Sequence, residues 1–204
     1  SQLSEQMSIP FAQDNPDEYE LLLAVTPDRM ELRSNGRDRI SPVYVDFIGG
    51  RLSHRRNMGG LSHQMVARAI GYKGIPLRVC DATTGLGRDM FLMACLGCQV
   101  TAVERSPVIA ALLNDGLRRA MSDQGTAEIL HERVTLIQGD AIALLRGLMS
   151  EHSFNAIYID TMFPPTGKSA LAKKEMRICR LITGKDIDAG ELLTAALDQL
   201  PDRV

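Results

Sequence analysis

The feature that most constrains this chain is residues 78–89 (RVCDATTGLGRD), an apolar run that ends in an aspartate and continues through two glycines. Val79 and Cys80 fit a buried strand, and the apolar residues after Asp89 recur at helical spacing. The pattern therefore predicts a strand, a tight loop and a helix. A glycine loop lets the backbone approach a ligand closely and places the N–H groups of the helix beside that ligand.

The next predicted strand, residues 99–103, ends in Glu104. An acidic side chain at the end of the second strand of a βαβ unit can accept hydrogen bonds from both hydroxyls of a ribose. We therefore expect this unit to hold an adenosine-containing molecule. A dinucleotide fingerprint requires a third glycine where this chain has Met90, which disfavours a dehydrogenase.

Asp81 lies four residues before Gly85, and a carboxylate in the loop suits a ligand that has an ammonium group and no phosphate. The form D-x-x-x-G-x-G, ending at Gly87, resembles the first motif of class I S-adenosylmethionine-dependent methyltransferases. The alternative is a plain strand–loop–helix turn with incidental glycines.

Two further predicted strands also end in aspartates: residues 134–140 end at Asp140, and residues 154–159 lead to Asp160. Helical patterns over 62–70, 107–120, 141–149 and 186–200 alternate with the strands, which favours an α/β fold with a mostly parallel sheet. Ligands bind such sheets at the carboxyl ends of the strands, so the acidic residues should share one edge. In a methyltransferase Asp140 would contact the adenine amino group, or it caps the helix that follows, or both.

Residues 160–165 (DTMFPP) resemble the [DNS]-P-P-[FYW] motif of methyltransferases that act on exocyclic amino groups. Such a nitrogen is a poor nucleophile because its lone pair is delocalised into the ring. A carboxylate at Asp160 that accepts an N–H would aim the lone pair at the methyl donor, which is catalysis by orientation and electrostatics. Phe163 would stack on the base, or it is an ordinary core residue.

Two basic segments are candidate RNA-binding surfaces. Residues 51–60 place His54, Arg55 and Arg56 between two diglycines, and a solvated surface loop is the equal alternative. Residues 168–180 form a predicted amphipathic helix that follows the presumed catalytic motif, and a solvated cationic face is its alternative. The basic residues of this helix that we assign to RNA are Lys168, Lys173, Lys174 and Arg177.

Composition narrows the remaining possibilities. A net charge of −2 and an aromatic content of 4% mean that any RNA site is a local patch and not an extended stacking platform. No apolar run is long enough to span a bilayer and no signal pattern opens the chain, so we expect a cytoplasmic protein without a membrane partner. His54 and His63 have no metal-binding partner at ligand spacing. Cys95 and Cys98 form a lone C-x-x-C at a helix end, so buried apolar cysteines are expected and no metal site.

The N-terminal part reads differently. Residues 19–26, 29–33 and 43–47 have strand-like patterns, so residues 1–50 are expected to form a small β-rich extension and residues 51–204 the cofactor-binding domain. The chain begins at Ser1 and ends as a new apolar element starts. We therefore expect it to be part of a longer protein.

From residue 43 to residue 196 the chain resembles the ribosomal small subunit methyltransferase J family, which methylates N2 of a guanine near the 3′ end of bacterial 16S rRNA. The matching segments are VDFIGG (45–50), HRR (54–56), DATTGLGRD (81–89), ERSPVIAALL (104–113), D-x-MFP (160–164) and KSALAKKEMR (168–177). The resemblance implies a Rossmann-like fold, S-adenosylmethionine as the cofactor, and 16S rRNA or the 30S subunit as the partner. The cofactor contacts that it implies are Arg88, Asp89, Glu104, Arg105, Asp140, Ala141 and Asp160.

Thr161 departs from the family pattern, which has proline after the catalytic aspartate. The family also continues past residue 204 into further strands, so the resemblance implies that this chain lacks the C-terminal strands of the domain. Thr161 and these missing strands favour one alternative, a non-catalytic protein that binds the cofactor or RNA. A second alternative is an amino-group methyltransferase that acts on DNA or protein, because the Asp160 motif type also serves those substrates. The sequence does not indicate the oligomeric state, nor whether free rRNA or the assembled subunit is the substrate.

Overall fold

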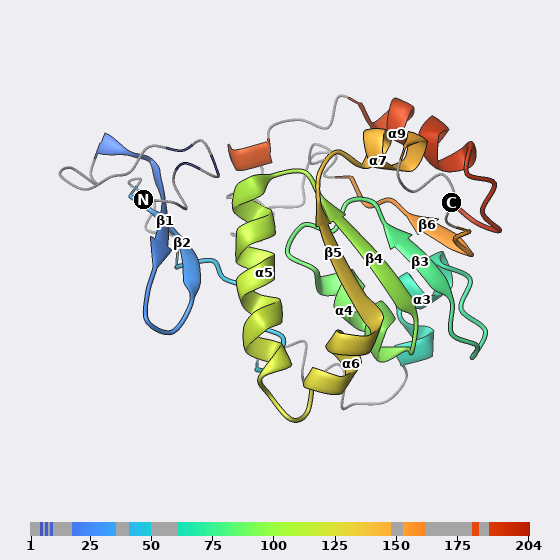
Figure 1. The fold of residues 1–204 in the computed structure, drawn as a ribbon, viewed down its shortest axis with the longest axis horizontal. Coiled ribbons are helices and arrows are strands. Elements are labelled where there is room, and N and C mark those ends of the chain that lie inside the picture. The colour runs from blue at the N-terminus through green and yellow to red at the C-terminus, as the bar shows by residue number, and fades with distance from the viewer. Residues whose placement is uncertain are drawn as a thin grey trace, which may run out of the picture.

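The computed structural model describes residues 18–35, 41–49, 61–147, 153–161, 181–183 and 188–204, and the single positions 5, 7 and 9. The fold of these residues is shown in Figure 1. Within them, a four-stranded parallel sheet carries the site, and a two-stranded antiparallel hairpin precedes it in the chain.

The parallel sheet has the strand order β5-β4-β3-β6. Its strands are β3 (Arg78–Asp81), β4 (Gln99–Glu104), β5 (Val134–Gln138) and β6 (Ala156–Tyr158). In register, Asp81 pairs with Ala102 on one side and with Tyr158 on the other. Parallel alignment brings the acidic ends of the strands to one edge, so the predicted α/β fold with a mostly parallel sheet is confirmed.

Helices cover both faces of the sheet, as in doubly wound folds. Val79 and Ala102 pack in the cluster that contains α3 (Met65–Ala69), α4 (Arg88–Cys95), α5 (Pro107–Met121) and α6 (Ala127–Arg133). On the other face, Cys80 and Val103 pack against α7 (Ala141–Arg146) and α9 (Ala189–Leu197). A short 3₁₀ helix, η2 (Leu61–His63), precedes α3.

The start of α5 illustrates how the sequence sets an element boundary. Ser106 is the N-cap and its Oγ accepts a hydrogen bond from Ile109 N, while Pro107 occupies the first helical position. Proline suits that position because its missing N–H would have no partner in the helix. The predicted helix 107–120 is therefore confirmed, with one residue added at its end.

The hairpin consists of β1 (Leu21–Val25) and β2 (Met30–Ser34) and lies beside α5 (Figure 1). Met30 N donates to Asp115 Oδ2 of α5 at 3.1 Å. The predicted strand over 43–47 is replaced by a single bridge, in which Val43 pairs with Leu32. Val45 and Phe47 continue from that bridge into the core, where both are buried.

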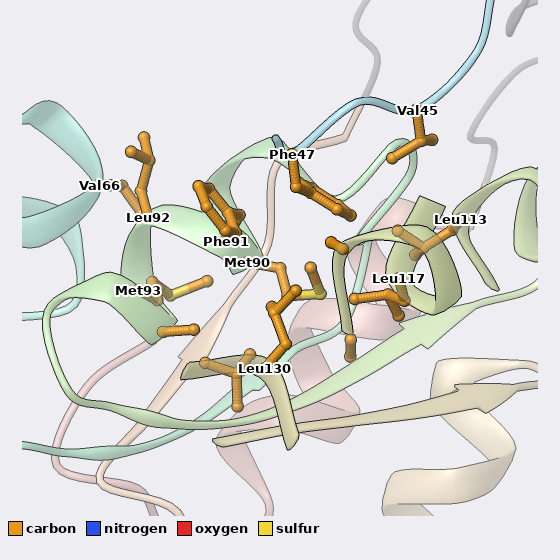
Figure 2. Packing of buried hydrophobic residues seen from close by; sticks show 14 of the residues in the cluster. Val45, Phe47, Val66, Met90, Phe91, Leu92, Met93, Leu113, Leu117 and Leu130 are labelled. Atoms are coloured by element: carbon orange, nitrogen blue, oxygen red, sulfur yellow. The ribbon is translucent and has the colours of Figure 1, made fainter. Parts of the chain in front are cut away.

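The first glycine loop, residues 82–87 between β3 and α4, has a tightly filled core behind it. The rings of Phe47 and Phe91 stack with centroids 5.0 Å apart, and Met90 and Leu113 gather beside them (Figure 2). All four side chains are fully buried. Residues 43–47 therefore form part of the support on which the loop before α4 rests.

Candidate functional site

A cavity of about 360 Å³ opens at the carboxyl ends of the parallel strands. Such an edge is where ligands bind in parallel α/β sheets. All but one of the residues expected to bind a cofactor line this cavity: Asp81, Gly85, Arg88, Asp89, Glu104, Arg105, Asp140, Ala141 and Asp160. The exception is Gly87, which packs against the core behind the loop.

The first glycine loop is held by its own backbone and by Glu104. Gly85 and Gly87 have φ angles of +55° and +74°, in the left-handed region that favours glycine. Thr84 Oγ1 donates to Asp81 O at 3.0 Å, and Gly87 N donates to Thr84 O at 2.9 Å. These bonds turn the chain sharply from β3 into α4.

Glu104 ties the end of β4 to this loop. Its Oε2 accepts a hydrogen bond from Gly85 N at 2.9 Å, and its Oε1 accepts one from Ser106 N at 2.7 Å. A carboxylate can accept more than two hydrogen bonds, so these contacts are compatible with the ribose-binding role expected from the sequence.

Carboxyl groups dominate the electrostatics of the cavity. Burial raises the pKa of the Asp81 carboxyl to about 8, and the N–H of Thr83 partly opposes the rise. The negative charges of Asp89, Asp160 and Glu104 raise the Asp81 pKa further. The pKa of Asp160 is also raised, by burial and then by the charge of Asp89. A cationic ligand would relieve this repulsion, so the cavity suits a positively charged molecule.

Asp140 combines the two roles that the sequence left open. Its Oδ1 accepts a hydrogen bond from Ala143 N at 2.9 Å, which is the N-cap interaction of α7. The residue also lines the cavity, as does Ala141 after it. The cap interaction fixes the position of Asp140 on the cavity wall. Its contact with the adenine of the cofactor stays a prediction.

The structure adds side chains that the sequence did not single out. Tyr158 lines the cavity, and its hydroxyl donates to Asp89 Oδ2 at 2.9 Å. Burial raises the pKa of this phenol, and the charge of Asp89 adds to the effect. Thr83 Oγ1 accepts a hydrogen bond from Asp160 N at 2.8 Å. Residues two apart in a strand point to the same side, so the position of Tyr158 two residues before Asp160 was the only sequence signal that it faces the cavity.

The start of α9 forms a further wall of the cavity. Asp188, which is the N-cap of the helix, and Leu192 line the cavity there, and Thr183 also lines it. Asp188 accepts two hydrogen bonds from Arg105 Nη1, at 2.9 Å and 3.2 Å. This ion pair joins the end of β4 to α9 across 83 residues of sequence, and nothing in the local pattern of either segment indicated it.

Several expected residues lie outside the part of the chain that the structure describes. They are Phe163 and the candidate RNA-binding residues His54, Arg55, Arg56, Lys168, Lys173, Lys174 and Arg177. Among the described residues, no group of three or more His, Cys, Asp or Glu side chains could hold a metal ion. Within the same residues, no helix has the length and apolar character needed to cross a membrane.

Comparison with known proteins identifies the fold and the family. A family of S-adenosylmethionine-dependent methyltransferases matches residues 2–204. The chain is similar to a crystal structure of a SAM-dependent methyltransferase from Neisseria gonorrhoeae, with a TM-score of 0.71 and 30% identity. That match covers 96% of this chain and 74% of the other.

Curated relatives are more similar in sequence. Ribosomal RNA small subunit methyltransferase J of Aeromonas salmonicida is 46% identical over 201 residues, which cover 98% of this chain and 80% of the relative. The proteins of the same name from Pseudomonas aeruginosa and Coxiella burnetii are 47% and 45% identical and are covered to 76% and 78% of their length. They align with 98% and 99% of this chain. The protein therefore belongs to the ribosomal RNA small subunit methyltransferase J family, whose members depend on S-adenosylmethionine.

Proposed function

We propose that the protein transfers a methyl group from S-adenosylmethionine to the exocyclic N2 of a guanine in 16S rRNA. The observation that carries the proposal is the placement of Asp160 and the buried Asp81 on one cavity at the carboxyl edge of the sheet. The relatives' shared name supports the choice of small-subunit ribosomal RNA as the substrate.

The described residues fit the cofactor. S-adenosylmethionine carries a sulfonium and an ammonium group, and the carboxyl groups around the cavity favour cations. We assign the ammonium end to the loop around Asp81, the ribose to Glu104, and the adenine to Asp140 and Ala141. When bound, the cofactor supplies a methyl group on a positively charged sulfur.

Asp160 is the catalytic residue of the proposal. Its backbone N–H donates to Thr83 Oγ1, and the residue lies exposed on the cavity wall, two positions after the end of β6. We propose that the carboxylate accepts an N–H of the guanine amino group, which turns the nitrogen lone pair out of conjugation and toward the methyl group. As the N–C bond forms the S–C bond breaks, S-adenosylhomocysteine leaves as the neutral thioether, and the methylated nitrogen releases one proton to solvent. Loss of one preorganised hydrogen-bonding group of this kind lowers a rate by about 10²–10³-fold. Phe163 is proposed to stack on the base.

The partner is proposed to be 16S rRNA, as free RNA or within the 30S subunit. His54, Arg55, Arg56 and the basic residues of 168–177 would contact phosphates. A ribosomal substrate implies action in the cytoplasm and requires no membrane. We also retain the division into an extension, residues 1–50, and a cofactor-binding domain, residues 51–204, as a proposal.

The test uses radiolabelled S-adenosylmethionine with 30S subunits, free 16S RNA, DNA and protein offered in parallel. Label recovered as N2-methylguanine in RNA is the expected result. We expect Asp160→Ala, which removes the acceptor oxygen, to lower the transfer rate by about 10²–10³-fold while it weakens cofactor binding much less. Asp198→Ala, at the exposed end of α9, is the matched control and should leave both unchanged.

Label in DNA or protein would replace the RNA substrate with another amino-group acceptor. Cofactor binding without transfer to any substrate would favour a non-catalytic role. Equal losses of cofactor binding and transfer in Asp160→Ala would contradict the role of Asp160 in orienting the amine.

A further inference from the structure

At the end of β6, the carbonyl of Tyr158 accepts a hydrogen bond from Ala82 N, just after β3, at 2.9 Å. Beyond it, Asp160 N donates to the side chain of Thr83 at 2.8 Å and not to a backbone carbonyl. The two residues are 77 positions apart in the chain. A side-chain hydroxyl thus takes the place of a ladder partner at the residue proposed to carry catalysis.

Thr83 is itself fixed on the opposite side. Its backbone N–H donates to Asp81 Oδ1 at 3.3 Å, and the next residue, Thr84, donates its backbone N–H to Val103 O at 3.1 Å. The hydroxyl of Thr83 therefore belongs to the rigid part of the first glycine loop. A contact from a rigid element restricts the backbone of Asp160, and with it the direction of the carboxylate.

Thr161 makes this contact more important. A proline at that position would fix its own φ near −65° and would restrict the conformation of the residue before it. Threonine does neither. In this chain, Thr161 does not restrict the backbone of Asp160 as a proline would, and the hydrogen bond from Asp160 to Thr83 provides a restraint instead.

We propose that Thr83 is a positioning residue. Its hydroxyl sets the orientation of Asp160 and links the glycine loop between β3 and α4 to the residue proposed to orient the amine. The inference rests on the proposed function, in which Asp160 orients the guanine amine. Thr83 lines the cofactor cavity, but its proposed role is exerted through Asp160.

The kinetic test compares Thr83→Val, which keeps the branched shape and removes the acceptor, with Thr83→Ser, which keeps the acceptor. Thr194→Val is the control, because Thr194 Oγ1 donates to Gly190 O at 3.0 Å within α9, away from the cavity. We expect Thr83→Val to lower the single-turnover rate of methyl transfer by about 10–100-fold, since a small misplacement of a reacting group costs that much. The cofactor dissociation constant should change little, and Thr83→Ser should restore most of the rate.

Three kinetic results would overturn the inference. The first is a Thr83→Val enzyme that transfers methyl at the parent rate, and the second is a loss in rate that matches the loss in cofactor binding. The third is a Thr83→Ser enzyme that is as slow as Thr83→Val, because the hydroxyl acceptor would then not be the cause.

A second measurement separates this inference from the proposed function. Hydrogen exchange at the Asp160 amide needs no substrate, and we expect faster exchange in Thr83→Val but not in Thr83→Ser. Unchanged exchange in Thr83→Val would refute the positioning contact even in an active enzyme. A parent protein that transfers methyl to nothing would refute the proposed function, while exchange would still decide whether Thr83 holds Asp160.

Discussion

The two glycines of the cofactor loop allow backbone strain and packing to be measured separately. Both have positive φ, +55° at Gly85 and +74° at Gly87. A methyl group added at Gly85 meets only Thr83 O, at 4.0 Å. One added at Gly87 meets Leu113 Cδ1 at 2.6 Å and Phe47 Cζ at 3.2 Å. The pair Gly85→Ala and Gly87→Ala therefore shares the strain and differs in the crowding.

The expected magnitudes follow from these contacts. An L-residue in the left-handed region costs about 1–2 kcal/mol, which both variants incur. An extra methyl group in a filled core costs a further 1–3 kcal/mol, roughly, and this applies only to Gly87→Ala because Leu113 and Phe47 are fully buried. We expect Gly85→Ala to lose about 1–2 kcal/mol of unfolding free energy and Gly87→Ala to lose about 2–5 kcal/mol.

Urea unfolding of the two variants and the parent protein, without cofactor, provides the measurement. The slope with denaturant should stay constant while the midpoints fall in the order parent, Gly85→Ala, Gly87→Ala. Equal losses in the two variants would refute the packing argument, since the loop would then accommodate the methyl group by moving. A larger loss in Gly85→Ala would refute the assignment of the two environments.

Two further predictions concern cofactor binding. Because the Asp81 pKa is about 8, the carboxyl is mostly protonated at pH 7, and a cation that binds its ionised form must release that proton. The cofactor dissociation constant should therefore fall by up to about tenfold per pH unit between pH 6 and 7.5. Calorimetry in buffers of different ionisation enthalpy should detect the proton, and Asp81→Asn should abolish both effects; a flat profile in the parent would contradict the raised pKa. Asp188→Ala, which leaves Arg105 without this carboxylate, should weaken cofactor binding by about two- to fivefold, the range of a partly exposed ion pair. Glu191 also lies at the start of α9, and Glu191→Ala breaks its ion pair with Arg146 of α7, away from the cavity. This control should leave equilibrium binding of the cofactor unchanged. Equal effects of the two variants would mean that α9 and not Arg105 is responsible.

The sequence predicted the acidic edge of the sheet because each signal was local. An apolar run followed at once by Asp81, Glu104 or Asp160 marks both the strand and its end, and the parallel topology then brings the ends together. The start of α5 was equally local, since Ser106 and Pro107 are adjacent.

Contacts between distant segments could not be predicted in the same way. The bond between Thr83 and Asp160 and the ion pair between Arg105 and Asp188 depend on where whole elements pack. Helix α6 was missed because only Leu130 in it is buried, which leaves little helical periodicity to detect.

The N-terminal segment shows how a correct pattern can lead to a wrong element. Val43, Val45 and Phe47 are buried, while Tyr44 is exposed, so the period of two predicted a strand. The alternation is real because the chain is extended there. Within residues 43–47 only Val43 has a bridge partner, and the buried side chains of Val45 and Phe47 pack against helices instead of a sheet face.

The contact between that segment and α5 also constrains how the sequence can vary. Gly116 stands within α5, where glycine costs about 1 kcal/mol relative to alanine. A Cβ at this position would collide with the side chain of Val45, and Arg119 of the same helix donates to Val45 O. The glycine within α5 thus marks the place where the N-terminal segment docks. Among relatives, a larger residue at position 116 should occur only with a smaller one at position 45, so these two positions should covary although 70 residues separate them.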